Sequence, residues 1–318
     1  MSVTPPRAGA GALQTPALGV NAARRSSRAR TLASDYLELT KPKVQSLLLL
    51  TTIATMYVAG DPSPLLVALT CLGGYLSAGG AGAVNHWFDR DIDARMKRTA
   101  TRPIPAGRIA PAAALAFGCT LACLSVLELW LTVNPLAAAL SFSGFLGYVF
   151  VYTVWLKRRT PQNIVIGGAA GAVPPLVGWA AVTGSLSGIA VMLFFIVFFW
   201  TPAHFWALSL LMQDEYRRVG VPMLPVVRGE AETRRQILLY SVLLYAVTQL
   251  PFCAGGFGVI YLVASMLLGL GFVAGAVRLY RTGGRPPAIG RRAALHVYLY
   301  SLAYLALLFS AMVADKHL

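Results

Sequence analysis

Residues 188–211 read GIAVMLFFIVFFWTPAHFWALSLL and decide the fold class. The stretch contains no Asp, Glu, Lys or Arg, and about 20 consecutive apolar residues in a helix are enough to cross the hydrocarbon core of a bilayer. Strands of a membrane barrel would instead be short segments of alternating polarity. Eight further stretches approach the required length, at roughly 44–60, 65–86, 111–131, 136–156, 163–183, 236–254, 257–277 and 293–314. We therefore predict an all-α polytopic membrane protein with nine transmembrane helices around a central cavity.

The composition agrees with a membrane protein. Hydrophobic residues make up 57% of the 318-residue chain and charged residues only 12%, against roughly 25% charged in ordinary globular domains. The net charge of +15 could suggest nucleic-acid binding, but the basic residues are confined to alternate loops. We therefore expect no nucleic-acid partner.

The placement of basic residues predicts the orientation in the membrane. If odd-numbered spans run outward, all but one of the 27 Lys and Arg residues fall on one side, and only Lys316 falls on the other. Lys and Arg are enriched in cytoplasmic loops, so the N-terminus is predicted in the cytoplasm and the C-terminus outside. The surplus of positive charge could also attract anionic membrane lipid or an anionic substrate.

The N-terminal segment has a different composition from the rest of the chain. The first 33 or so residues contain no acidic residue and are rich in Arg, Ser, Ala and Pro. Such a segment is typical of a disordered tail or of an organellar transit peptide. We favour a disordered basic cytoplasmic tail over 1–35, followed by a membrane domain over 36–318. A bacterial inner membrane is the predicted location, and the mitochondrial inner membrane is the less favoured alternative.

Both signs of charge are concentrated in residues 85–108, NHWFDRDIDARMKRTATRPIPAGR, directly after the second span. Asn85, Asp89 and Asp93 are spaced four residues apart, which places them along one side of a helix. Such oxygen-bearing side chains suit a hard cation, and Mg²⁺ prefers one or two carboxylates together with substrate phosphates and water. A solvated helix end with acids paired to nearby arginines is the alternative.

A similar arrangement ends the sixth span, in residues 204–225, HFWALSLLMQDEYRRVGVPMLP. Asp214 and Glu215 are expected at the same cytoplasmic surface, followed by Arg217 and Arg218. Two acidic clusters accompanied by arginines could bind a diphosphate through Mg²⁺ and through direct guanidinium contacts. An apolar bundle beneath them would accept a hydrophobic tail, so the residues predict an isoprenyl diphosphate as substrate.

These segments resemble the UbiA superfamily of intramembrane prenyltransferases. The motif over 85–108 is shared across the superfamily, whereas KRRTPQNIVIGG at 157–168 and GVPMLPV at 220–226 are typical of its haem-modifying branch. The resemblance runs from about Leu37 to the C-terminus. It implies nine helices, Mg²⁺-dependent use of farnesyl diphosphate, and haem b as acceptor. The implied product is haem O, for use by haem–copper oxidases directly or after conversion to haem A, with a haem A synthase or oxidase assembly factors as possible partners.

The resemblance also implies roles for individual residues. The first motif falls on Asn85, Asp89 and Asp93, and the second on Asp214 and Glu215. The common pattern has a second aspartate where this chain has Glu215, which gives Asp214 more weight as a ligand. The implied catalytic residues are Asn85, Asp89, Asp93 and Asp214, with Asp89, Asp93, Asp214 and Glu215 as metal ligands. The cations expected to stabilise the leaving diphosphate are Arg98, Arg102, Lys157 and Arg218.

Two histidines are candidates for contact with haem. His86 lies three residues before Asp89, on nearly the same side of the helix. His204 lies within the sixth span, and ionisable side chains at membrane depth are functional candidates. His204 could bind the haem iron or a propionate, and a hydrogen bond between helices near Pro202 is the structural alternative for it.

Two other functions compete with this prediction. A related enzyme that prenylates an aromatic acid or a quinone precursor would share the diphosphate site and differ only in its acceptor. A transporter would place its buried charges near the midplane, at broken helices, whereas here the acids gather at one interface.

Overall fold

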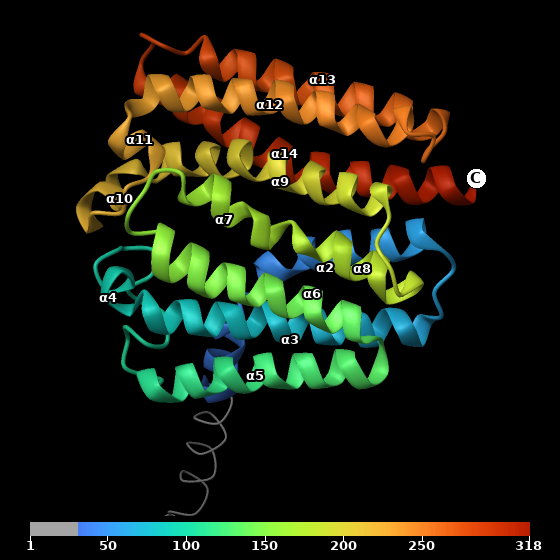
Figure 1. Cartoon of the computed structure of the whole chain (residues 1–318). Coiled ribbons are helices and arrows are strands. Elements are labelled where there is room, and N and C mark those ends of the chain that lie inside the picture. Colours follow the sequence, from blue (N-terminus) through green and yellow to red (C-terminus); the bar gives the residue numbers. More distant parts are fainter. Residues whose placement is uncertain (1–30) are drawn as a thin grey trace, which may run out of the picture.

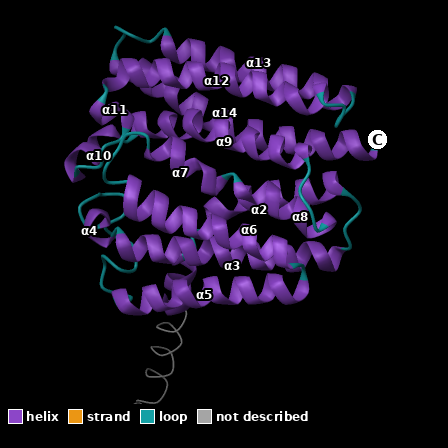
Figure 2. Cartoon of the chain, viewed as in Figure 1, coloured by secondary structure: helices purple, strands orange, loops and turns teal. Residues whose placement is uncertain are grey.

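The computed structural model describes residues 31–318, and helices make up the fold. No strand occurs among these residues (Figure 2). Eight helices are long and apolar enough to cross a membrane, so the chain is a multi-pass membrane protein, as predicted. They lie roughly side by side in a bundle (Figure 1). The eight spans are α3 (Pro64–Phe88), α5 (Pro111–Thr132), α6 with η1 (Pro135–Leu156), α7 with α8 (Asn163–Thr183), α9 (Gly188–Leu211), α12 (Gly229–Cys253), α13 (Val259–Tyr280) and α14 (Pro287–His317).

The first predicted span corresponds to α2 (Pro42–Ala59), which has 18 residues. It is not among the eight, because Lys43 and Gln45 in its first turn and several threonines further along lower the hydropathy of its 18 residues. It nevertheless packs inside the bundle, against α8 and α14. The count of nine membrane-crossing helices and the orientation of the termini stay predictions.

Two of the predicted spans are irregular helices. The span over 136–156 begins as α6 (Pro135–Leu146) and continues as a π-helix, η1 (Gly147–Leu156). In its last turn the amide of Lys157 donates to the carbonyl of Tyr152, five residues back. Helical segments of this kind are rare and are frequently found at functional sites.

The span over 163–183 is interrupted near its middle. Helix α7 (Asn163–Gly171) ends two residues before α8 (Val173–Thr183) begins. Pro174 and Pro175 follow at once, and the missing amide hydrogens of proline prevent a continuous helix. The proline pair in the sequence predicts such an interruption, and the two helices α7 and α8 confirm it.

Small residues allow α3 and α5 to pack closely against each other. A Cβ atom placed on Gly80 would lie 2.7 Å from the carbonyl oxygen of Gly118. The hydroxyl of Ser125 donates to the carbonyl of Gly73 at 2.7 Å across the same interface. Membrane helices that lack a hydrophobic driving force between them associate through such close packing and hydrogen bonds.

One end of the bundle carries additional short helices. These are α4 (Arg90–Asp93), α10 (Gln213–Val219) and α11 (Leu224–Val227), and all three lie at the same end, on the left in Figure 1. The connections at the opposite end have no helix of their own. The elaborated end therefore carries both polar motifs.

The predicted tail lies mostly outside the described residues. Residues 31–39 are helical, so the packed chain includes residues that the sequence analysis assigned to the tail. Asp35 is buried and accepts a hydrogen bond from Nε of Arg108 at 2.9 Å. This pairing connects the start of the described chain to the loop before α5.

The α3–α5 contact yields a test with a control in the same helix. Gly80→Ala is expected to lower the free energy of unfolding by about 1–3 kcal/mol, because its Cβ would press on the backbone of α5. Gly74→Ala makes the same chemical change where the nearest neighbouring atom is 3.8 Å away, at Leu49. Thermal unfolding of the detergent-solubilised variants measures the difference. Equal melting temperatures would show that α5 moves away without cost.

Candidate active site

The first polar motif is buried at the end of α3. Asn85 and Asp89 are 3% and 1% exposed, although they lie at the surface end of a membrane helix. The side-chain amide of Asn85 donates to Oδ2 of Asp89 at 2.7 Å and to the hydroxyl of Thr153 at 3.1 Å. Asp89 ends α3, and its one-turn continuation α4 carries Asp93, which is 4% exposed. The spacing therefore places three buried oxygen donors in succession, as predicted.

Positive side chains from two other segments neutralise the buried carboxylates. Lys157, directly after η1, forms an ion pair with Oδ2 of Asp89, and Arg158 lies 3.5 Å from Oδ1. Arg102 contacts Asp93 at 2.6 Å. A buried carboxylate without such partners would be strongly unfavourable, so each aspartate is held by at least one cation.

Lys41 also enters this site, and the sequence analysis assigned it no such role. It precedes α2 and adopts a left-handed backbone conformation with φ of 55°. Its Nζ donates to Oδ1 of Asn85 at 2.6 Å and to the hydroxyl of Tyr148 at 3.3 Å. Burial, reinforced by the charges of Arg102 and Lys157, lowers the pKa of Lys41 to about 7. An anion bound beside it would favour the ammonium form.

The π-helix η1 supplies the uncharged part of the site. Tyr148, Tyr152 and Thr153 all lie on it, and Tyr148 and Thr153 each contact the Asn85–Lys41 pair as described above. The rings of Tyr148 and Tyr152 are 5.3 Å apart. Three site residues on one short segment give the irregular helix a direct role in shaping the site.

Arg158 connects the loop that follows η1 to the end of α3 and to α4. Its guanidinium donates to both carboxylate oxygens of Asp91, at 2.9 and 2.7 Å, and to the carbonyl of Phe88 at 3.0 Å. The hydrogen bond from Arg158 is the main reason that the pKa of Asp91 is lowered. Asp91 thus holds the loop after η1 against α4, on the exposed side of the motif.

The two acids of the second motif face in different directions. The sequence analysis gave Asp214 more weight as a metal ligand, but Glu215 is the more buried of the two. The side chain of Asp214 is 65% exposed and pairs with the neighbouring Arg217 at 3.1 Å. Glu215, by contrast, has a buried Oε2 with no hydrogen-bond partner among the described residues. The next residue, Tyr216, is buried. Helix α10 therefore turns Glu215 and Tyr216 inward and Asp214 outward.

Charged side chains around the first motif influence a tyrosine of the second motif. Burial raises the pKa of Tyr216, and the charges of Lys157, Arg98 and Arg102 act against that rise. Tyr152 lies within electrostatic range of both Asp89 and Tyr216. The inward face of α10 therefore shares its surroundings with the first motif, and the two motifs are not on opposite flanks of the bundle.

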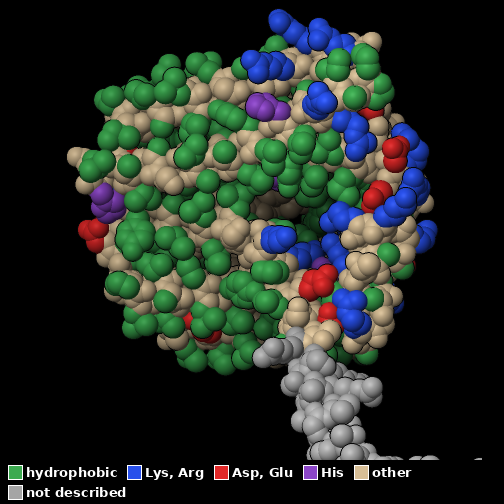
Figure 3. All heavy atoms as spheres, turned by 180° about the vertical axis from the view of Figure 1, so that it is seen from behind, with side chains coloured by type: hydrophobic (Ala, Val, Ile, Leu, Met, Phe, Trp, Pro, Cys, Tyr) green, Lys and Arg blue, Asp and Glu red, His purple; other side chains and the backbone are tan. Residues whose placement is uncertain are grey.

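The surface of the protein shows the same concentration of charge. Lys and Arg side chains gather along the edge that carries α4 and α10, on the right in Figure 3, with acids among them. The face in that view is hollowed near its centre, and basic side chains lie beside the opening. Arg98 and Arg218 are both exposed, whereas Arg102 is half-buried.

An apolar cavity of about 200 Å³ begins next to the charged groups. Lys41 and Tyr148 line it, and it continues between α2, α3, α6 and α8. Its other lining residues include Leu48, Leu49, Phe145, Val173 and Val177. A polar head bound near Lys41 could therefore extend an apolar tail into the protein.

The donor set fits a hard divalent cation bound together with phosphate. Among the described residues, no three His, Cys, Asp or Glu side chains form one metal-binding group. The buried carboxylates of Asp89 and Asp93 and the unpartnered oxygen of Glu215 are nevertheless the oxygen ligands that Mg²⁺ uses when substrate phosphates complete its coordination.

Comparison with known proteins identifies the family. The model of the UbiA prenyltransferase family matches residues 48–289. The chain belongs to this family. The match includes both polar motifs, the π-helix and most of the residues that line the apolar cavity, whereas Lys41 precedes it.

Curated relatives of this UbiA protein come from several bacteria. The chain is 55% identical over 289 residues to a protein of Chloroflexus aurantiacus named protoheme IX farnesyltransferase, covering 90% of the chain and 48% of the relative. A protein of the same name from Symbiobacterium thermophilum is 54% identical, with 88% of the chain and 93% of the relative covered. The chain spans about half the length of the first of these relatives and nearly all of the second.

Solved structures share the fold of this UbiA protein at low sequence identity. A structure of digeranylgeranylglyceryl phosphate synthase matches with a TM-score of 0.73 at 19% identity, over 90% of this chain and 99% of that chain. A UbiA homologue from Archaeoglobus fulgidus, bound to DMAPP and Mg²⁺, matches with a TM-score of 0.62 at 16% identity, over 87% and 99% of the two chains. These likenesses confirm the helical fold.

The two histidines of the UbiA protein lie in different surroundings. His86 is buried beside the first motif, and neither ring nitrogen has a hydrogen-bond partner among the described residues. His204 lies between α9 and α14. Its Nδ1 is 2.6 Å from the hydroxyl of Ser301, and its ring stacks on Trp200 and Tyr298, with centroids 4.3 and 5.0 Å away. The structure therefore does not bring the two candidate haem contacts together.

Sequence signals for the unforeseen site residues are weak. Lys41 resembles any basic residue that flanks a first span and contributes to topology. The hydroxyl groups of η1 occur in an apolar stretch whose pattern gives no sign of a π-helix. The one usable signal was the density of Tyr and Thr in residues 148–153, YVFVYT, at the cytoplasmic end of a span.

Proposed function

We propose that this UbiA protein transfers the farnesyl group of farnesyl diphosphate to a vinyl group of haem b, with addition of water, to make haem O. The observation that carries the proposal is the group of buried aspartates and their cations that adjoins, through Asn85 and Lys41, an apolar cavity. The names of the relatives support haem as the acceptor. The bacterial inner membrane is the proposed location.

The chain has groups for both parts of a prenyl diphosphate. Lys41, Lys157 and Arg102 would bind phosphate oxygens as charge-assisted donors, with Arg98 and Arg218 at the exposed side. In the absence of a ligand, Lys157 and Arg102 instead pair with Asp89 and Asp93. The farnesyl tail would occupy the cavity next to Lys41 and Tyr148.

Asp89, Asp93 and Glu215 are the proposed Mg²⁺ ligands, because their carboxylate oxygens are buried, with Asn85 beside Asp89 and the exposed Asp214 as an outer contributor. When bound, the metal supplies positive charge that neutralises the diphosphate and polarises the allylic C–O bond. The cations around these acids would remain close enough to hold them in place.

The reaction breaks the allylic C–O bond, the π bond of the vinyl group and one O–H bond of water, and it forms one C–C bond and one C–O bond. The allylic C–O bond breaks with its electron pair leaving on the diphosphate, where Lys157, Arg98 and Arg102 stabilise the developing charge. The vinyl carbon of haem then supplies the electrons of a new C–C bond to the farnesyl cation. Water adds to the resulting cation and releases a proton, which leaves a hydroxyl group. The apolar lining of the cavity would limit premature attack by water.

His204 is the proposed contact for the haem iron. A histidine that binds a metal commonly fixes its other nitrogen through a hydrogen bond, and Ser301 holds Nδ1 in this way. Nε2 is then the nitrogen left for the iron. His86, surrounded by the charges of Lys41, Arg102 and Lys157, is better placed to contact the diphosphate or the reacting end of haem.

The proposed product suggests how the protein functions in the cell. Haem O would serve a haem–copper oxidase directly or after conversion to haem A, so a haem A synthase or oxidase assembly factors are the proposed partners. With the N-terminus in the cytoplasm, the charged site would face the compartment from which a soluble diphosphate arrives.

The function is tested by the haem that the purified full-length protein makes. With farnesyl diphosphate, haem b and Mg²⁺, mass spectrometry is expected to detect haem that has gained one farnesyl group and one water. Asp89→Asn should reduce the rate by about 100-fold or more, because it removes a carboxylate that binds the metal. Prenylation of an aromatic acid or quinone precursor in place of haem would contradict the proposed acceptor.

The two acids of the second motif can be distinguished by matched variants. Glu215→Gln is expected to raise the Mg²⁺ concentration needed for half-maximal rate by about 10-fold or more. Asp214→Asn should change it by less than about threefold, because an exposed carboxylate paired with Arg217 contributes little. The measurement is the initial rate across a Mg²⁺ titration. A larger effect of Asp214→Asn than of Glu215→Gln on the Mg²⁺ dependence would make Asp214 the more important ligand, as the family pattern suggests.

The role of His204 is tested by haem binding in the absence of reaction. His204→Ala is expected to weaken haem binding, followed by the Soret band, and to leave binding of a farnesyl diphosphate analogue unchanged. His317→Ala, at the far end of α14, is the control. Undiminished haem affinity in His204→Ala would assign this histidine to helix packing through Ser301.

A further inference from the structure

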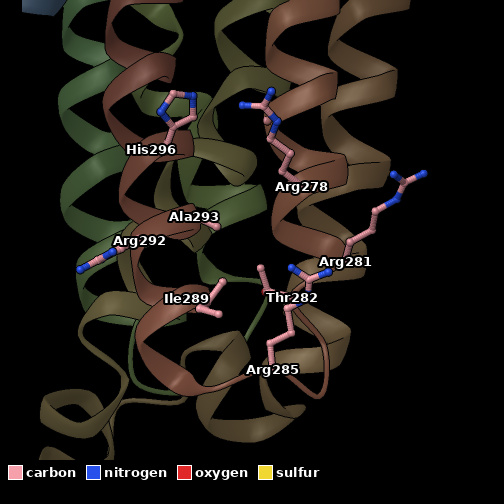
Figure 4. Close-up of a pocket in the computed structure, with 9 residues that line it drawn as sticks. Arg278, Arg281, Thr282, Arg285, Ile289, Arg292, Ala293 and His296 are labelled. Carbon is pink, nitrogen blue, oxygen red and sulfur yellow. The ribbon is translucent and has the colours of Figure 1, made fainter.

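A second cluster of positive charge surrounds a cavity of about 410 Å³ between the ends of α13 and α14. Arg278, Arg281, Arg285 and Arg292 line it, together with His296. Figure 4 shows Arg278 and His296 facing the gap from the two helices, with Arg285 nearer the loop that connects them. All five side chains belong to exposed residues, so the cavity is accessible from outside the protein.

None of these four arginines has an acidic partner among the described residues. The sequence has no Asp or Glu between Glu232 and Asp315, and no ion pair to any of the four occurs within residues 31–318. Four guanidinium groups around one cavity repel one another and gain stability from an anion between them. The enrichment of Lys and Arg in cytoplasmic loops explains positive charge at this surface. It does not explain why four arginines surround one cavity.

The cavity is separate from the proposed active site. Helix α13 packs on α12 and α14, whereas the acidic motif ends α3. In Figure 1 the α12–α13 pair and the α3–α5 pair lie at opposite edges of the bundle. None of the residues that line the cavity contacts the acids of either motif. A ligand here is therefore separate from the proposed diphosphate site.

We propose that this cavity binds the headgroup phosphate of an anionic phospholipid. Arginine suits this ligand because its planar guanidinium can donate two parallel hydrogen bonds to a phosphate. Basic pockets between membrane helices on the cytoplasmic side are a recognised setting for anionic headgroups. The four arginines provide enough charge for a headgroup with one or two phosphates.

The position of the cavity favours a lipid over a soluble phosphate. It lies at the ends of two membrane-spanning helices, where the headgroup layer is expected. Ile289, which lines it, is 42% exposed, and Leu295 and Leu299 further along α14 are 44% and 53% exposed. Acyl chains could follow these side chains while the phosphate stays between the arginines.

The proposal is tested by lipid retention of the full-length protein, measured by native mass spectrometry after exchange into detergent with added lipid. Phosphatidylglycerol is expected to be retained in preference to phosphatidylcholine with the same acyl chains. The double variant Arg278→Gln/Arg285→Gln should lower this retention by roughly 10-fold or more. Arg235→Gln/Arg291→Gln removes two positive charges from the same end of the protein, at positions that do not line the cavity, and should retain the lipid like the parent.

Two further outcomes would overturn the proposal. Equal lipid retention by the two double variants, whether high or low, would mean that the arginines act through general charge at the membrane surface. Saturable binding of inorganic phosphate to the lipid-free protein, measured by calorimetry and lost only in Arg278→Gln/Arg285→Gln, would assign the cavity to a soluble anion. Melting temperatures of all variants without lipid show whether each remains folded.

Discussion

The ion pair between Asp89 and Lys157 is the interaction on which the site depends. Asp89 is almost completely buried where a membrane helix reaches the surface, and a carboxylate in that position is tolerated only with a cation and hydrogen-bond donors around it. Those partners come from the end of η1 and from Asn85. The need to neutralise one carboxylate thus brings together two segments about 70 residues apart in the chain.

The same charge balance prepares the site for an anionic ligand. Under the proposed function, the cations that pair with the aspartates would contact phosphate oxygens when Mg²⁺ bound the carboxylates. That exchange would keep every buried charge paired. Lys41, whose lowered pKa reflects burial among other cations, belongs to the same balance.

Irregular helix geometry determines where these groups lie. The π-helix η1 carries Tyr148, Tyr152 and Thr153 into the site, and the break between α7 and α8 adjoins the apolar cavity, which Pro174 lines. A regular helix in place of either would present different side chains to the same space. The bundle supplies a rigid frame, and its two irregular spans give the cavity its shape.

The sequence by itself determined the helical membrane class, the two motifs and their common end, because apolar length and four-residue spacing depend only on local geometry. It could not place Lys41, whose left-handed backbone brings it to Asn85, nor identify a π-helix within an apolar run. Adjacent residues such as Asp214 and Glu215 point in directions about 100° apart on a helix. Which of them faces inward therefore depends on how α10 packs, and only the tertiary structure decided that Glu215 does.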